Sequence, residues 1–203
     1  MPLYKDFSDE KATILLWKFD EDEELDFENL IETENLEKIK NYHPTKITEA
    51  LLVRKALKSI LPSHKILYKE REPFLVPKDY CISITHSFPF AAVAVSKEKI
   101  GIDMEKFNPK ILRIEHKFIY PDEATFFSEQ DKMEYLTVIW SVKESLYKIH
   151  HSNYWSLKRN YKVEPFDLKN LNKINCSVYD DNNCDHFSAR VKFFEDFCFT
   201  IVD

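Results

Sequence analysis

The chain has 203 residues, of which 44% are hydrophobic and 14% aromatic, enough for one large core or two small ones. Its formal net charge is -6, whereas a general nucleic-acid binder normally carries a basic surplus, so that class is not expected. It has one glycine, Gly101, which excludes phosphate loops of the G-x-G-x-x-G and Walker types.

The cysteines and the apolar runs indicate where the protein resides. The four cysteines form no C-x-x-C pair, so neither a zinc knuckle nor a disulfide framework is indicated. No apolar run approaches the roughly 18 residues of a membrane span, and the N-terminus is rich in charged residues. We therefore expect a cytoplasmic protein outside the membrane.

The first half of the chain combines short apolar runs with one long helical pattern. Residues 12–19 predict a strand, and the acidic stretch 20–37 predicts one or two short helices. From Thr45 to Leu61, apolar side chains recur at spacings of three and four, which predicts a helix that Pro62 ends. Further strands are expected at 66–68, 74–76, 81–85 and 90–95, the last of them apolar throughout and therefore covered on both faces.

The second half again mixes strands and helices, beginning with a strand at 101–105. Pro109 and Pro121 can each open a helix, and a longer helix is expected at about 132–150. Strands are expected at 175–179, 186–194 and 197–202. We interpret the chain as two associated α+β halves, residues 1–99 and residues 100–203.

Two carboxylates follow Gly101 at alternate positions. In a strand, Gly101, Asp103 and Glu105 point to one face, so the bare glycine lies beside two oxygen ligands. Such ligands suit Mg²⁺, which usually takes one or two carboxylates and completes its shell with water and substrate phosphate. Taken alone, the pair is a weak signal, and a solvated strand edge is the more common explanation of such a pattern.

Glu144 and Lys148 are four residues apart in the last long helix. Most such pairs are surface ion pairs, but a carboxylate and an ammonium on one rigid helix also suit a metal ligand and a phosphate clamp. Arg54 lies in the apolar stripe of the first helix, either with its head in water or as an anion contact. His86 is in phase with the apolar residues before it, so a local hydrogen bond is the simplest role.

Four segments occur in a fixed order: residues 85–87 (THS), 101–106 (GIDMEK), 117–123 (KFIYPDE) and 140–148 (WSVKESLYK). Their order and spacing closely resemble those of the Sfp-type 4′-phosphopantetheinyl transferases. The resemblance covers about residues 51–148. It implies an α+β fold of two associated α/β halves in a pseudo-twofold arrangement.

The resemblance also implies an activity. Such enzymes move the 4′-phosphopantetheine arm of coenzyme A to a serine of an apo acyl or peptidyl carrier protein, and release adenosine 3′,5′-bisphosphate. Depending on the carrier, they serve fatty acid or secondary metabolite biosynthesis. By match of position, Mg²⁺ would be held by Asp103, Glu105 and Glu144. Lys148 would contact phosphate, and Glu144 or Glu123 would accept the serine proton.

Coenzyme A contacts are implied in the first half. His86 and Thr85 belong to the first matched segment, and Arg54 falls where the family has a cofactor contact. Where relatives show Gly-Lys-Pro, this chain has residues 71–73 (REP), so Arg71 either replaces the lysine or has no such role. The basic residues available ahead of the first long helix are Lys40 and Lys46.

The helix opened by Pro109 places Lys110, Arg113 and Lys117 on one face. This face is either an ordinary solvated surface or a docking site for the acidic recognition helix of a carrier protein. A monomer is expected, because one chain can supply both sides of the cofactor cleft. Two alternatives stay open: another metal-dependent enzyme that cleaves phosphodiesters, and a non-catalytic relative that binds carrier proteins.

Overall fold

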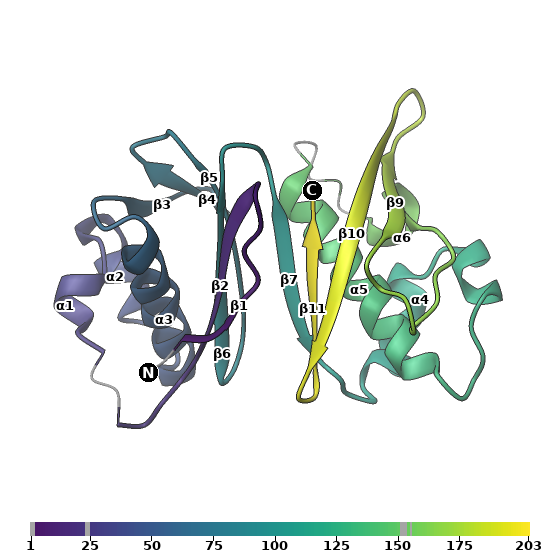
Figure 1. Ribbon diagram of the computed structural model, residues 1–203, viewed down its shortest axis with the longest axis horizontal. Helices are drawn as coiled ribbons and strands as arrows, with labels where there is room; N and C mark the ends of the chain where they lie inside the picture. Colours follow the sequence, from purple (N-terminus) through teal and green to yellow (C-terminus); the bar gives the residue numbers. More distant parts are fainter. Residues whose placement is uncertain (1–2, 23–24, 151–153, 155) are drawn as a thin grey trace. The chain divides into compact units, whose positions relative to one another are not determined.

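The computed structural model of the protein describes residues 3–22, 25–150, 154 and 156–203. The chain divides into two compact units, Met1–Ile100 and Gly101–Asp203, so the division lies one residue beyond the expected range 1–99. Each unit contains helices and an antiparallel sheet (Figure 1), which confirms the predicted α+β fold class.

The N-terminal unit is built on a four-stranded antiparallel sheet with the order β1-β2-β6-β5. These strands are Leu3–Asp6 (β1), Ala12–Lys18 (β2), Cys81–Ser87 (β5) and Phe90–Ser96 (β6). A separate hairpin consists of Lys65–Lys69 (β3) and Glu72–Val76 (β4). The helices are Phe27–Leu30 (α1), the 3₁₀ turn Thr33–Asn35 (η1), Leu36–Ile39 (α2) and Pro44–Ile60 (α3).

The core of the N-terminal unit lies between α3 and the sheet. Leu52 and Ala56 of α3 are fully buried with Val93 of β6 in one apolar cluster. Every residue of β6 is buried, as its unbroken apolar run predicted, and the strand is paired along both edges with β2 and β5. The apolar stripe of α3 thus determines how its N-terminal turn is placed against β5.

The C-terminal unit has a five-stranded antiparallel sheet with the order β7-β11-β10-β9-β8. The strands are Gly101–Lys106 (β7), Tyr161–Val163 (β8), Ile174–Tyr179 (β9), Cys184–Phe194 (β10) and Phe197–Val202 (β11). The helical segments are Ile111–Phe118 (α4), the 3₁₀ turn Pro121–Thr125 (η2), Lys132–Ile149 (α5) and Leu157–Asn160 (α6). Helix α5 packs on β7 and β11 through fully buried residues such as Val138 and Val142.

Gly101 lies where α5 packs against β7. A Cβ atom built on this residue would lie 2.1 Å from the carbonyl oxygen of Ser145. Real Cβ atoms do not approach backbone this closely, so only glycine fits without moving the helix. Because Gly101 has no side chain, the backbone of α5 can approach β7 closely beside the two carboxylates.

Some elements differ from the sequence prediction. The helix expected from Pro109 begins at Ile111, and Asn108 Oδ1 accepts the backbone N–H of Lys110 just before it. The helix expected from Pro121 is a five-residue 3₁₀ turn. Three short elements were not predicted, namely β1, α6 and β8. Within the described residues, no helix is both long enough and apolar enough to cross a membrane.

Candidate metal and phosphate site

Two rows of side chains face each other where α5 packs on β7. Trp140, Glu144 and Lys148 recur every four residues, so they lie on one face of α5. Asp103 and Glu105 alternate along β7 on the face that Gly101 turns toward α5. The candidate residues of the C-terminal unit therefore come from two rigid elements in direct contact.

Each carboxylate of β7 receives a hydrogen bond from α5. Lys148 Nζ donates to Asp103 Oδ1 and to the carbonyl oxygen of Ile102, both at 2.8 Å. Trp140 Nε1 donates to Glu105 Oε1 at 2.9 Å. Asp103 is only 5% exposed, which contradicts the alternative of a solvated strand edge.

Two carboxyl groups of this cluster have raised pKa values, first because they are buried and then because Asp103 is near. Burial, and then the charge of Asp103, raises the pKa of Glu105 to about 7, against the opposing effects of Trp140 and Lys148. Burial and Asp103 likewise raise the pKa of Glu144 to about 7, and Lys148 opposes them. The cluster thus holds more negative charge than Lys148 neutralises, which favours binding of a cation.

The donor set fits Mg²⁺ in its chemistry, because its side-chain ligands are all carboxylate oxygens. Across the described residues, however, no three His, Cys, Asp or Glu side chains are close enough together to enclose a metal ion. Mg²⁺ usually takes one or two carboxylates and completes its shell with water and phosphate. The cluster therefore fits a metal that binds together with a phosphate ligand.

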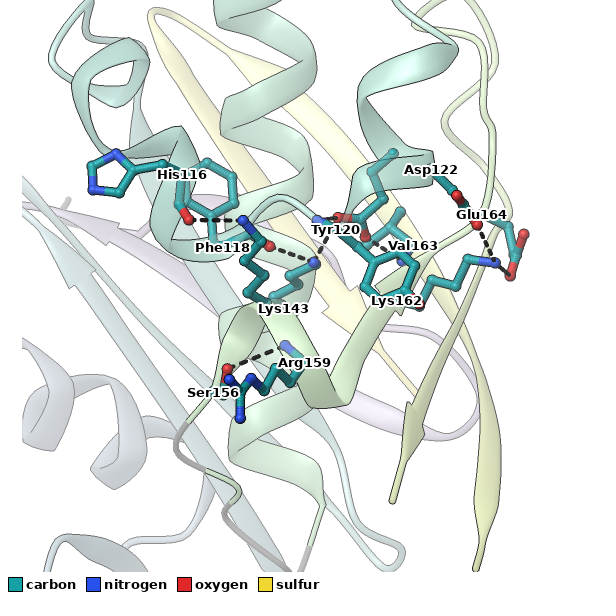
Figure 2. Close-up of polar contacts among 12 residues, drawn as sticks. His116, Phe118, Tyr120, Asp122, Lys143, Ser156, Arg159, Lys162, Val163 and Glu164 are labelled. Carbon is teal, nitrogen blue, oxygen red and sulfur yellow. Dashed lines mark hydrogen bonds and ion pairs between the residues drawn. The ribbon is translucent and has the colours of Figure 1, made fainter. Parts of the chain in front are cut away.

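Glu123 was predicted as a candidate base, and its surroundings in the structure speak against this role. Its carboxylate is fully buried and accepts Lys143 Nζ at 2.7 Å, as well as the backbone N–H groups of Tyr120 and Val163 at 2.6 and 2.8 Å. Figure 2 shows that Lys143 is also bonded to the carbonyl oxygen of Phe118. Because a general base must reach the proton it accepts, this closed network makes Glu123 a structural residue.

A second polar cluster lies in the N-terminal unit, between α3 and β5. Glu49 Oε2 is 2.8 Å from Lys46 Nζ and 3.0 Å from His86 Nδ1, and the last two atoms are 3.4 Å apart. The side chains of Lys46 and His86 are 55% and 38% exposed, so both can meet a ligand. Glu49 was not singled out in the sequence, although its i, i+3 spacing from Lys46 was a usable signal.

Arg54 is buried, which contradicts the alternative that its head lies in water. Its side chain is 1% exposed, and its Nε donates to Glu32 Oε2 at 2.7 Å. The anion that its head contacts here is the carboxylate of Glu32, and a contact with the cofactor stays a prediction. Thr85 is 4% exposed, which argues against the predicted cofactor contact. Arg71 is exposed in the turn between β3 and β4.

Helix α4 presents basic side chains to solvent. Lys110 just before the helix is exposed, as are Arg113 and Lys117 within it. The acidic residue of the helix, Glu115, pairs with Lys132 of α5 at 3.1 Å, and this pairing neutralises its charge. The exposed face of α4 is therefore dominated by positive charge.

The comparisons with known proteins agree with this geometry. The 4′-phosphopantetheinyl transferase superfamily matches residues 99–202, a range that includes every residue of the β7–α5 cluster. The chain belongs to this superfamily. The curated 4′-phosphopantetheinyl transferase gsp of Aneurinibacillus migulanus is 29% identical over 106 residues, which cover 48% of this chain and 44% of that protein.

Proposed function

We propose that this chain transfers the 4′-phosphopantetheine arm of coenzyme A to a serine of an apo carrier protein, in a reaction that requires Mg²⁺. The observation that carries the proposal is the cluster of Asp103, Glu105, Glu144 and Lys148, inside the segment that matches the superfamily. Such a cluster suits the binding of a metal ion together with a pyrophosphate.

In the proposed reaction, the serine oxygen attacks the phosphorus that carries the pantetheine arm. A new P–O bond to serine forms, and the P–O bond to the adenosine 5′-phosphate breaks. Adenosine 3′,5′-bisphosphate leaves with the bonding electrons, and the serine proton passes to a base. Glu144 is the remaining candidate for this base, because its carboxylate is partly exposed whereas that of Glu123 is buried.

Asp103, Glu105 and Glu144 are the candidate metal ligands, and one or two of them would bind the ion directly beside water and substrate phosphate. When bound, Mg²⁺ supplies positive charge that stabilises the pyrophosphate and the leaving group. Lys148 is held by Asp103 and Ile102 on rigid backbone, yet its side chain remains 28% exposed. Its ammonium is therefore placed to contact a phosphate oxygen without a large loss of side-chain entropy on binding.

We assign phosphate binding in the N-terminal unit to Lys46 and His86. Both are partly exposed, and the buried carboxylate of Glu49 orients them. Arg71 remains a further candidate, because it is exposed in the turn between β3 and β4. The basic face of α4, formed by Lys110, Arg113 and Lys117, is proposed to bind an acidic helix of the carrier protein.

The test is incubation with coenzyme A, Mg²⁺ and an apo carrier protein. Transfer should increase the mass of the carrier by about 340 Da, the mass of one arm bound to serine. A phosphodiester hydrolase would instead consume coenzyme A without a carrier, and a non-catalytic relative would bind the carrier without modifying it. The absence of a mass shift on fatty-acid, polyketide and peptide carriers would refute the transferase proposal.

A matched pair of variants distinguishes loss of a residue of the proposed metal site from loss of a negative charge elsewhere. Asp103→Asn removes a buried carboxylate of the cluster and should abolish transfer. Asp181→Asn makes the same chemical change on an exposed residue of the β9–β10 turn, and should leave the rate unchanged. Equal rates for the two variants would show that the metal assignment is wrong.

A further inference from the structure

Trp140 stands in the same row of α5 as Glu144 and Lys148, but neither metal binding nor phosphate contact explains a tryptophan there. An indole ring offers one polar atom, the Nε1–H donor, and no acceptor. In this structure that donor is bonded to Glu105 Oε1 at 2.9 Å. The only polar group of Trp140 is thus used on a carboxylate of the proposed metal site.

The indole is held in place by its surroundings. Its ring packs edge-on against the ring of Phe118, with centroids 5.1 Å apart and planes at 73°. Phe118 is fully buried, and its carbonyl oxygen accepts Lys143 Nζ from α5 (Figure 2). An indole fixed in this way can direct a carboxylate, because a donor on a mobile ring would follow the carboxylate instead.

The other carboxylate of β7, that of Asp103, is also held by a donor from α5. Lys148 Nζ holds Asp103 Oδ1 as Trp140 Nε1 holds Glu105 Oε1, and Glu144 lies between the two donors along α5. Donors from one helix therefore orient both strand carboxylates. The neutral indole N–H does this for Glu105 without adding a positive charge that would compete with a metal ion.

We propose that Trp140 is a positioning residue, whose N–H fixes the carboxylate of Glu105 so that it can serve as a ligand of Mg²⁺ in the cluster that it forms with Asp103 and Glu144. This inference rests on the proposed function, in which Glu105 is a metal ligand. It assigns Trp140 no contact with coenzyme A or the carrier protein. Its effect should therefore appear in the affinity for Mg²⁺.

The test compares Trp140→Phe, which keeps an aromatic ring and loses the N–H, with Trp17→Phe as a matched control. Trp17 is buried in the N-terminal unit, and its Nε1 has no hydrogen-bond partner among the residues that the structure describes. Isothermal titration with Mg²⁺, in the presence of coenzyme A, should give a dissociation constant about tenfold higher for Trp140→Phe, the usual effect of losing such a partner. Trp17→Phe should match the wild type.

Kinetic measurements distinguish positioning from simple loss of packing. In Trp140→Phe, the Mg²⁺ concentration for half-maximal transfer should rise about tenfold, while kcat at saturating Mg²⁺ falls less than about twofold. A lower kcat with an unchanged Mg²⁺ requirement would overturn the proposal, because Trp140 would then act on another part of the site.

A spectroscopic measurement covers the case in which Trp140→Phe does not fold. In a protein whose only tryptophan is Trp140, Glu105→Leu should shift the indole emission, because the N–H loses its acceptor. Mg²⁺ should also change this emission in the single-tryptophan protein that retains Glu105. An emission unaffected by both changes would refute the role of Trp140.

The outcomes separate this inference from the proposed function. If the wild type transfers the arm and binds Mg²⁺ while Trp140→Phe binds it within about twofold as well, the inference fails and the function stands. If the wild type binds no Mg²⁺ even with coenzyme A present, the metal site fails, and the inference fails with it.

Discussion

The α-carbon of Gly101 faces the carbonyl oxygen of Ser145, so closely that a Cβ atom would lie only 2.1 Å from that oxygen. Ser145 follows Glu144 directly, and Gly101 is two residues before Asp103. This contact therefore determines how near α5 lies to β7 at the point where the two elements supply the carboxylate cluster. The single glycine of the chain is required by helix–strand packing.

The first prediction concerns Gly101→Ala. The added methyl group meets backbone atoms of Ser145 and the Cβ of Ile149, 3.3 Å away, so the helix must move. We expect a loss of about 1–3 kcal/mol or more in the free energy of unfolding, as for other overpacked cores. Urea unfolding would measure this loss, and titration calorimetry should show weaker Mg²⁺ binding.

Ser145→Ala is the matched control for this prediction. It changes the side chain at the contact and leaves the carbonyl oxygen in place. The buried hydroxyl that it removes has no hydrogen-bond partner within the described part of the chain. Its stability should stay within about 0.5 kcal/mol of the wild type. A Gly101→Ala protein as stable as this control would contradict the packing argument.

The sequence was sufficient to predict which residues form the cluster in the C-terminal unit. It did not predict that Gly101 lies against the backbone of α5. Two-residue spacing on a strand placed Asp103 with Glu105, and four-residue spacing on a helix placed Glu144 with Lys148. Periodicity of this kind fixes the face of an element and not its neighbour. Hence Lys148 was considered as a partner of Glu144, and its hydrogen bond to Asp103 could not be foreseen.

Two candidate residues are buried in ion pairs that the sequence did not indicate, for one physical cause. Arg54 and Glu123 are charged residues, and such residues are expected at the surface, yet each is buried with a partner distant in sequence. The partners, Glu32 and Lys143, lie 22 and 20 residues away. A pairing over such a distance depends on the tertiary fold, and no local pattern in the sequence reports it.

The second prediction tests the buried pair of Glu123 and Lys143. Lys143→Met leaves a buried carboxylate without its cation, and Glu123→Gln leaves a buried ammonium without its anion. Each should cost about 3–5 kcal/mol of unfolding free energy. The double variant should lose much less than the sum, because the amide introduced by Glu123→Gln can still accept a backbone N–H and no charge remains buried.

Urea unfolding of the four proteins in this cycle gives the coupling energy between the two residues. We expect it to exceed about 1 kcal/mol, since the side chains are in contact and fully buried. Strictly additive losses would show that the pair does not act as a unit. A folded Glu123→Gln protein should keep measurable transfer activity, whereas loss of transfer in a stable protein would restore Glu123 as a catalytic candidate.

The third prediction distinguishes the role of Arg54 in stability from the role of His86 in binding coenzyme A. Arg54→Met breaks the buried bond to Glu32 and should lower stability, but the folded protein should keep its KM for coenzyme A within about twofold. His86→Ala removes a partly exposed side chain and should raise that KM roughly tenfold, as expected for the loss of one hydrogen bond to a charged group.

Steady-state kinetics with varied coenzyme A check both variants. His186→Ala serves as the control for His86→Ala, because His186 is an exposed histidine on β10 of the other unit. Arg54→Lys, which keeps a positive charge, shows whether lost stability accounts for any change in rate. A roughly tenfold rise in KM for Arg54→Met without a loss of stability would return Arg54 to the cofactor site.

The last prediction concerns the basic face of α4. Replacing Lys110, Arg113 and Lys117 with glutamine removes three exposed positive charges that we propose attract an acidic helix of the carrier protein. The KM for the carrier should rise about tenfold at low salt, with kcat and the KM for coenzyme A within about twofold. The effect should shrink as salt increases, because salt screens charges exposed to solvent.

The matched control changes the same amount of charge elsewhere in the C-terminal unit. Lys169, Lys173 and Lys192 are exposed and lie outside α4, so their replacement by glutamine lowers the net charge equally. This control should keep the carrier KM of the wild type if α4 is the docking face. Equal losses in the two triple variants would mean that the carrier protein responds to total charge, and α4 would then have no specific role in docking.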